Sequence, residues 1–444
     1  MRSDWETRKL RECCDFNPSS IKSDWPHRSL RYIDISSVGE GIQTEPPQLF
    51  LRSEAPSRAQ RLVAPGDCLL STVRPNRRSM LWLRFVADDI VASTGFAVLR
   101  AKRRIIFPRY LYYIIFNQTF TDYLVTREKG AAYPAVGIDD IGDAEIALPP
   151  FAQQKAIAHI LGTLDDKIEL NRRMNATLEA MARALFQSWF VDFDPVRAKL
   201  DGRKPAGLDP DTAALFPTQF QDSPLGHIPN GWEVKTIEEL AERVAMGPFG
   251  SDIKVSTFAP EGIPIVSGQH LRGILLDDSE FNFISEEHAN RLKRSNVQRG
   301  DVIFTHAGSI GQVAYIPETS RYERYIISHR QFYMRCNRSV ISPFYITLYF
   351  KTPEGQHRLL ANTSSTGVPS ISQPVTYLRQ LQMVVPPPAL LKVFDATVGT
   401  IHFKMAHNEE QSRTLATLHD TLRPKLLNGE LSVAAGAEEM EAIA

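Results

Sequence analysis

The stretch LGTLDDKIELNRRMNATLEAMARALFQSWF, residues 161–190, has the apolar spacing of a long helix. Apolar residues recur at alternating steps of four and three, which is the 3.5-residue repeat of a coiled-coil seam. The repeat begins a few residues before the quoted stretch, and its middle holds asparagine where an apolar residue is expected. The predicted seam positions are Ile157, Leu161, Leu164, Ile168, Asn171, Leu178 and Leu185.

The same pattern returns at a fixed offset of 237 residues. Residues 149–189 and 386–426 share eleven identities in 41 positions, among them Asn171 with Asn408. Such self-similarity indicates an internal duplication. Two matching seams bury each other most simply as an antiparallel pair, with the asparagines fixing the register, although each helix packed on its own domain is the alternative. The second seam comprises Phe394, Val398, Ile401, Met405, Asn408, Leu415 and Leu422.

The regions upstream of the two seams also correspond. Trp5-Glu6 matches Trp232-Glu233, and Pro65-Gly66-Asp67 matches Arg299-Gly300-Asp301. Short β-rich runs such as DCLLSTV and DVIFTHA alternate with brief helical runs such as YLYYIIFN and FYITLYF, which predicts an α+β fold. The complete prediction is two globular domains separated by two long antiparallel helices that form a coiled coil, with pseudo-two-fold symmetry. The boundaries are 1–150 for the first domain, 151–195 for its helix, 196–224 for a linker, 225–385 for the second domain, 386–431 for its helix and 432–444 for a frayed tail.

Composition narrows the class of protein. The chain has 444 residues, 43% of them apolar, and 51 basic residues balance 51 acidic ones. No apolar run reaches the roughly 20 residues of a membrane span and the N-terminus has no signal core, so we expect a cytoplasmic protein without a membrane partner. The four cysteines form no C-x-x-C pair, and we expect neither a metal nor a redox site.

A catalytic site is not expected either. The chain has no Gly-rich phosphate loop, and Leu148 occupies the place where an amino-methyltransferase motif needs Asn or Asp before Pro-Pro-aromatic. Glu233 and Lys235 have the spacing of a nuclease motif, and a metal-dependent nuclease is kept as a minor alternative. His306 and His329 lie near serines, but no G-x-S-x-G elbow frames those serines.

Two pairs of turns, one pair in each domain, combine small residues with cationic or amide side chains. Residues 71–79 and 129–137 form the first pair, and residues 305–312 and 364–372 occupy the corresponding places. Such side chains contact phosphates and base edges, so two similar scaffolds with different loops predict two different DNA readers. A two-headed scaffold that binds peptides is the alternative. The candidate DNA contacts are Thr72, Arg74, Asn76, Arg77, Arg78, Lys129 and Tyr133, and then Thr305, His306, Ser309, Gln312, Ser365, Thr366 and Ser370.

A family resemblance follows from three segments. The stretch from Leu148 to Lys199 resembles the central helical region of the DNA-specificity subunits of type I restriction-modification systems. GHIPNGWEVKTIEEL is similar to the entry of their second target-recognition domain, and MGPFGSDIK is similar to a loop in it. The second helical region matches more loosely, because it lacks the aromatic ending of the first and Pro424 interrupts it near its end.

The resemblance implies a non-catalytic subunit that binds a bipartite double-stranded DNA target, one half with each domain. It also implies two methyltransferase subunits as partners, which carry S-adenosylmethionine, and restriction subunits that join for cleavage, so no cofactor is expected in this chain. Aromatic residues gather at the end of the first helix, and we expect them to form an exposed surface for a partner subunit, with packing on the adjacent domain as the alternative. These residues are Phe186, Trp189, Phe190 and Phe193.

Overall fold

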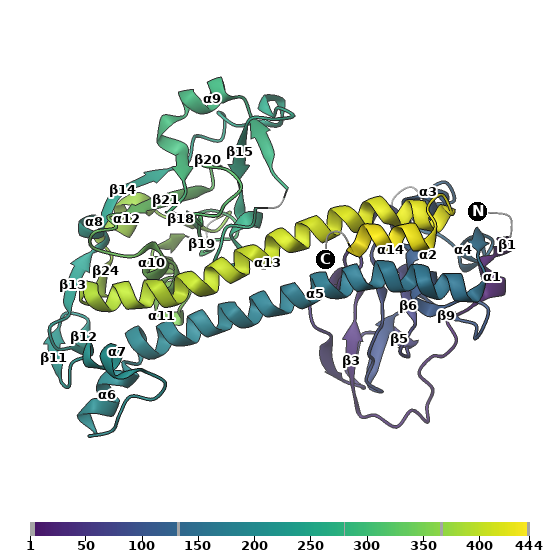
Figure 1. The fold of residues 1–444 in the computed structure, drawn as a ribbon, viewed down its shortest axis with the longest axis horizontal. Coiled ribbons are helices and arrows are strands. Elements are labelled where there is room, and N and C mark those ends of the chain that lie inside the picture. The colour runs from purple at the N-terminus through teal and green to yellow at the C-terminus, as the bar shows by residue number, and fades with distance from the viewer. Residues whose placement is uncertain (1–4, 131–133, 279, 365–366, 442–444) are drawn as a thin grey trace. The chain divides into compact units, whose positions relative to one another are not determined.

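The computed structural model describes residues 5–130, 134–278, 280–364 and 367–441 (Figure 1). The chain divides into two compact units. Unit 1 comprises residues 1–170 and 411–444, and unit 2 comprises residues 171–410. The two long helices are α5 (Phe151–Phe186) and α13 (Pro388–Asn428), and each of them contributes one segment to unit 1 and one segment to unit 2. None of the described helices is both long and apolar enough to cross a membrane.

The globular part of unit 1 contains two four-stranded sheets and a closing pair of strands. The sheets have the orders β4-β3-β8-β5 and β2-β9-β6-β7, and β1 pairs with β10 beside the start of α5. The strands are β1 (Glu6–Lys9), β2 (Cys14–Phe16), β3 (Ser29–Ile33), β4 (Gln48–Leu51), β5 (Ala59–Leu62), β6 (Cys68–Ser71), β7 (Met80–Trp82), β8 (Ile90–Ser93), β9 (Phe96–Ala101) and β10 (Glu145–Leu148). The helices are α1 (Leu10–Cys13), α2 (Pro108–Ile115), α3 (Gln118–Val125) and α4 (Ile138–Gly142).

Unit 2 repeats this topology. Its sheets have the orders β16-β15-β20-β17 and β14-β21-β18-β19, and β13 pairs with β24 beside the start of α13. The strands are β13 (Glu233–Thr236), β14 (Ala241–Met246), β15 (Ile263–Val266), β16 (Asn282–Ile284), β17 (Asn296–Gln298), β18 (Asp301–Thr305), β19 (Val313–Tyr315), β20 (Arg324–Ile327), β21 (Gln331–Cys336) and β24 (Gln382–Val385). The helices are α8 (Ile237–Leu240), α9 (Glu286–Arg291), α10 (Pro343–Tyr349), α11 (Pro353–Leu360) and α12 (Pro374–Gln380). The predicted α+β class and internal duplication are confirmed.

One ion pair demonstrates the duplication at the level of single atoms. In unit 1, Arg100 donates to both carboxylate oxygens of Asp67 at 2.8 and 2.7 Å, and in unit 2 Arg335 donates in the same way to Asp301 at 2.8 and 2.7 Å. Each aspartate follows a glycine with φ near +90° and is only 1% exposed. Because a buried carboxylate needs a charged partner, this pair fixes the start of the β6–β7 hairpin to β9 in unit 1 and the start of the β18–β19 hairpin to β21 in unit 2.

The two seams pair in the antiparallel direction, as predicted. In unit 2, Asn171 donates through Nδ2 to the carbonyl of Asn408 at 3.2 Å, and Asn175 donates to the carbonyl of Met405 at 3.0 Å. The Asn408 amide in turn donates to Oδ1 of Asn175 at 2.8 Å. Asn171 and Asn408 are at most 2% exposed, so both amides donate these hydrogen bonds in a buried layer. A polar layer of this kind specifies the register of two helices.

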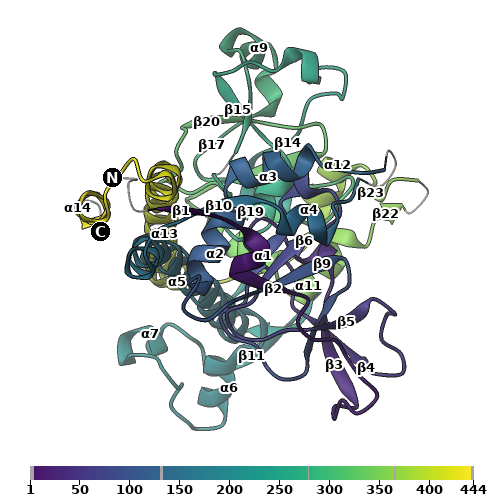
Figure 2. The same cartoon turned by 90° about the vertical axis from the view of Figure 1, so that its right-hand side faces the viewer.

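In unit 1 the other segments of the same helices also lie side by side (Figures 1 and 2). Leu161 and Leu164 of α5 share one buried cluster with Leu415 and Leu422 of α13. The His419 ring lies 3.4 Å from the carboxylate of Asp165. The predicted seam residues are therefore the ones that each unit buries or half-buries.

Two predicted boundaries need correction. The tail from Val433 to Glu441 is a helix, α14, and Val433, Ala437 and Met440 pack on the core of unit 1; residues 442–444 of the predicted frayed tail lie outside the described residues. The region 196–224 is folded rather than a free linker. It contains part of α6 (Asp194–Leu200), all of α7 (Pro210–Ala214) and β11 (Phe220–Ser223), which pairs with β12 (Gly226–Pro229).

Pro424 does not end the second helix, because α13 continues to Asn428. A proline inside a helix costs about 3 kcal/mol. Burial of Leu422, Leu426 and Leu427 in the core of unit 1 offsets this cost.

His402 of α13 is a buried polar residue in unit 2. It is 4% exposed, its ring lies 4.6 Å from that of Phe344 on α10, and neither ring nitrogen has a hydrogen-bond partner among the described residues. Burial lowers the pKa of His402 to about 4. The folded chain therefore holds this imidazole neutral.

We predict an acid-sensitive contribution to stability from His402. Below the ordinary histidine pKa of about 6.5, the unfolded chain takes up a proton that the folded chain does not, so stability present above pH 6.5 is lost as the pH falls towards 4. Relative to His402→Leu, the wild type should lose up to about 1 kcal/mol per pH unit in this window. Urea unfolding of both full-length chains at pH 7.5, 6 and 5 measures this difference. Parallel pH curves for the two proteins would contradict the assignment.

Candidate nucleic-acid interface

The predicted reading loops lie at equivalent places in the two units. The first loop of each pair joins the antiparallel strands of a hairpin, β6 with β7 in unit 1 and β18 with β19 in unit 2. The buried aspartate of the ion pair described above lies directly before β6 in unit 1 and is the first residue of β18 in unit 2. A rigid hairpin whose root is fixed in the core therefore presents each loop.

The structure brings the two loops of each pair together. In unit 1 the amide of Arg74 donates to the carbonyl of Pro134 at 2.8 Å, and that of Val136 donates to Thr72 at 2.8 Å. In unit 2, Gly308 donates to Pro369 at 3.0 Å, and Ile371 donates to His306 at 2.8 Å. This shared backbone pattern makes one composite surface from two segments that are about 60 residues apart in the chain. The internal repeat of the sequence predicted the positions of these loops, but not the backbone hydrogen bonds between the two loops of each unit.

Unit 1 presents Asn76 and Arg77 at the tip of its hairpin loop. Both are exposed, whereas Pro75, which directly precedes them, is buried. Arg74 and Arg78 bracket the tip with φ of +50° and +51°, a left-handed conformation that is uncommon for residues with a side chain. The tip is therefore a tight, fixed turn.

Three other predicted contacts of unit 1 make internal interactions. Arg78 donates to Gln118 Oε1 and to the Phe116 carbonyl, both at 2.6 Å, which anchors its side chain within unit 1, and its contact with DNA stays a prediction. Thr72 donates through Oγ1 to the Gly95 carbonyl at 2.9 Å. Lys129 lies 3.2 Å from Asp140 but is 79% exposed, which leaves it accessible to a phosphate.

Unit 2 presents a less charged loop. Ser309 is exposed, and His306, Gln312 and Ser370 are half-buried. His306 contacts the His329 carbonyl through Nε2 at 3.1 Å, and burial lowers the pKa of His306, so a neutral ring faces the loop surface at neutral pH.

Thr305 is 2% exposed, and its hydroxyl donates to Gln312 Oε1 at 3.3 Å. Its assignment as a DNA contact is therefore wrong, because it is the last residue of a buried strand. The predicted contacts Tyr133, Ser365 and Thr366 lie outside the described residues.

A third segment of unit 2 joins this surface and was not predicted. The turn at residues 328–331 receives the amide of His306, which donates to the Arg330 carbonyl at 2.9 Å. Residues 247–258 lie against the same turn, because the amide of Gly247 donates to the Gln331 carbonyl at 2.8 Å. The available signal was the run MGPFGSDIK, where a phenylalanine sits among turn-forming residues.

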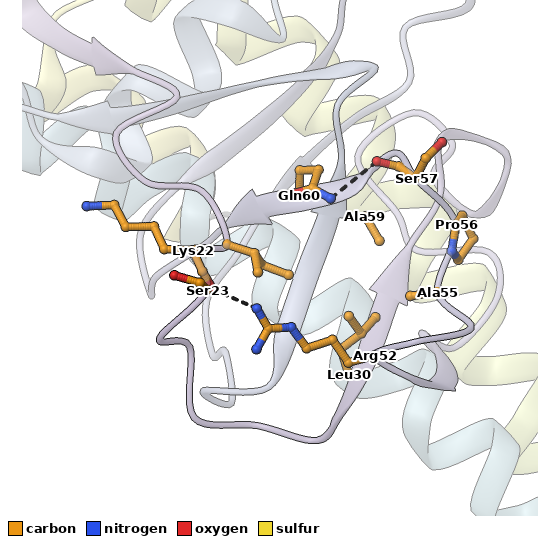
Figure 3. Close-up of a pocket in the computed structure, with 10 residues that line it drawn as sticks. Lys22, Ser23, Leu30, Arg52, Ala55, Pro56, Ser57, Ala59 and Gln60 are labelled. Carbon is orange, nitrogen blue, oxygen red and sulfur yellow. Dashed lines mark hydrogen bonds between the residues drawn. The ribbon is translucent and has the colours of Figure 1, made fainter.

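A shallow pocket of about 260 Å³ lies in unit 1, away from the paired loops in sequence (Figure 3). Arg52 is its main cation, and its guanidinium donates to the carbonyls of Trp25 at 2.9 Å and Lys22 at 2.6 Å. Gln60 donates to the Ser57 carbonyl at 3.3 Å. These polar groups hold the loop that forms the rim, and we assign no ligand to the pocket.

Comparison with known proteins identifies the family. A model for the type I restriction modification DNA specificity domain matches residues 2–180. The HindI specificity subunit of Haemophilus influenzae is 24% identical over 423 residues, covering 85% of this chain and 89% of that protein. The MjaIX specificity subunit of Methanocaldococcus jannaschii is 24% identical over 440 residues, covering 97% of this chain and 94% of that protein.

Residues 2–180 thus match the DNA specificity domain, and the chain is similar over most of its length to specificity subunits of type I restriction-modification systems. Its fold is similar to the crystal structure of the type I restriction-modification S subunit from M. genitalium, with a TM-score of 0.53, 14% identity and coverage of 95% of this chain and 96% of that chain. The resemblance stated from the helical region is confirmed.

The aromatic residues at the end of α5 lie in the core of this specificity subunit. Phe186, Trp189, Phe190 and Phe193 are between 1% and 9% exposed. The Phe190 ring lies 4.9 Å from that of Phe394, and the Phe193 ring lies 5.6 Å from that of Trp232. The prediction that they form an exposed partner surface is therefore wrong, because the domain and linker of unit 2 cover them.

The nuclease alternative rested on two residues that contact each other on β13. Lys235 Nζ lies 2.7 Å from Glu233 on the same strand, and Glu233 is 65% exposed. An exposed ion pair of neighbouring side chains accounts for both residues. Within the described ranges, His, Cys, Asp and Glu form no cluster of three suited to a metal ion.

We predict that neighbouring arginines of the specificity subunit act in different ways. Arg77→Ala should leave the unfolding free energy unchanged and weaken DNA binding, with a smaller salt slope if the lost contact is a phosphate. Arg78→Ala should lower the unfolding free energy by about 1–3 kcal/mol, because the carbonyl and amide that it bridges lose their donor. Urea unfolding and fluorescence anisotropy with duplex DNA measure the two effects. Equal destabilisation by both variants would contradict this division.

Proposed function

We propose that this chain binds a bipartite double-stranded DNA target and reads one half with each globular domain. The observation that carries the proposal is the repeated scaffold: the same backbone pairing, Arg74 to Pro134 and Gly308 to Pro369, presents different side chains in the two units. Unit 1 offers exposed Asn76 and Arg77, whereas unit 2 offers Ser309 and a neutral His306. Because the two loops share a backbone geometry but present different hydrogen-bond donors and acceptors, they are suited to reading two different DNA sequences.

The paired helices serve as the spacer in this proposal. At 1.5 Å per residue, the 36 residues of α5 extend over about 54 Å. Two half-sites on the same face of a duplex lie one helical turn apart, about 34–36 Å, or a multiple of that distance. A helix of this length therefore suits two reading domains on one DNA molecule. The buried asparagine layer keeps the register of the pair, and with it the spacing.

The chemistry belongs to other subunits in this proposal. Two methyltransferase subunits bind the specificity subunit and carry S-adenosylmethionine, and restriction subunits join for cleavage. This chain itself needs no cofactor. The match to the DNA specificity domain and the similarity to specificity subunits support this division.

A domain exchange tests the modular reading. Residues 1–150 are replaced by the corresponding domain of another specificity subunit, so that β1 and β10 stay together as a native ladder. In cells with the modification subunits, mapping of methylated adenines should reveal a new sequence in one half of the target and no change in the other. A change in both halves would contradict the proposal.

A salt titration separates DNA reading from peptide binding. Binding of the purified complex to duplex DNA should weaken steeply between 50 and 200 mM salt, because released counterions contribute to the affinity. A random duplex serves as the control for specificity. If the complex does not bind DNA, or if its DNA affinity does not change with salt, the two-headed peptide scaffold would be favoured.

A further inference from the structure

Phe249 of unit 2 is the most exposed large apolar side chain of the described residues, with an exposed fraction of 85%. Exposing a phenylalanine to this extent is unfavourable, since burial of such a side chain is worth about 1.5–3 kcal/mol. Isolated exposed apolar residues are common on protein surfaces, so the surroundings of Phe249 decide whether it has a role.

The loop that carries Phe249 is held in a defined conformation. The Phe249 amide donates to Oδ2 of Asp252 at 3.2 Å, and the Asp252 amide donates back to the Phe249 carbonyl at 2.9 Å. Ile253 packs on the buried cluster that contains Ile265 and Ile326. Gly247 has no room for a side chain, because the Ser328 carbonyl occupies that space. The ring is thus presented from a fixed turn.

This loop belongs to the same surface as the reading loops. A side chain at Gly250 would touch the His329 ring at 3.6 Å, and the His329 carbonyl contacts His306. Arg330 and Lys254, on the same two segments, are both exposed. An exposed aromatic ring on a fixed turn, with exposed cations on the same two segments, has the composition of a nucleic-acid contact, whereas the core of a protein interface is depleted in lysine.

We propose that the Phe249 ring stacks against the bases of the DNA half-site that unit 2 reads, by wedging at a base step. This inference rests on the proposed function. Wedging partly unstacks two base pairs, and the step that yields most easily is a pyrimidine–purine step. Phe249 therefore supplies sequence preference at a position without hydrogen bonds, which suits a unit whose hairpin loop has few charged side chains.

The test uses the full chain assembled with the modification subunits and duplexes with 2-aminopurine at single positions of the target. Binding of the wild type should raise 2-aminopurine fluorescence at one step of the half-site read by unit 2. Phe249→Ala should abolish that rise and weaken specific binding about 10- to 100-fold, with an unchanged salt slope. Phe249→Trp should restore both.

The matched control is Phe403→Ala, which removes a phenylalanine of the same unit that is 65% exposed on α13, outside the loops. It should bind DNA as the wild type does. Because both rings are exposed, both variants should keep the wild-type melting temperature.

The possible failures are distinguishable. If the wild type shows no specific DNA binding, the proposed function fails and this inference with it. If the wild type binds specifically but Phe249→Ala matches it in fluorescence and affinity, only the Phe249 assignment is overturned. If Phe249→Ala instead lowers subunit assembly while assembled complexes bind DNA normally, the ring is a protein contact and the assignment is again overturned.

Discussion

The hydrogen-bonded layer of Asn171, Asn175 and Asn408 is the constraint on which the organisation of this chain depends. Apolar seams alone would allow the two helices to slide by a heptad, because leucine and valine layers differ little in energy. A buried amide tolerates only the register in which its donor meets an acceptor. Here each amide finds its partner across the pair, at distances from 2.8 to 3.2 Å.

Each globular domain also packs against a segment of the helix that follows the other domain in the sequence. Within unit 1, leucines of the C-terminal helix, among them Leu415 and Leu422, share one buried core with residues of the N-terminal domain and of α5. Within unit 2, Phe186 and Trp189 from the first helix complete the core around Phe394. Each domain therefore shares its core with residues of both helices.

Periodic and repeated features were predictable from the sequence because they are local. The 3.5-residue spacing predicted the seam residues. The repeated Gly-Asp turn predicted the positions of the two hairpins, and the structure adds the pairing of its aspartates with Arg100 and Arg335. Features that depend on distant contacts were not predictable. The burial of Phe186 against Tyr345 and Phe394, the burial of Thr305 and the anchoring of Arg78 to Gln118 all depend on residues distant in the chain. The helix through Pro424 is similar, since leucine burial in a core outweighs the local preference.

Disulfide formation across the helical pair tests the account most directly. The full chain is prepared with Asp165→Cys and His419→Cys, whose native side chains are 3.4 Å apart, so that the asparagine layer stays intact, and the four native cysteines are all buried. Mild oxidation should join these two positions within one chain, whereas Asp165→Cys with Thr417→Cys, an exposed position of α13, should remain reduced. Absence of the first cross-link, or equal formation of both, would contradict the antiparallel register on which the proposed spacer and the division between two readers depend.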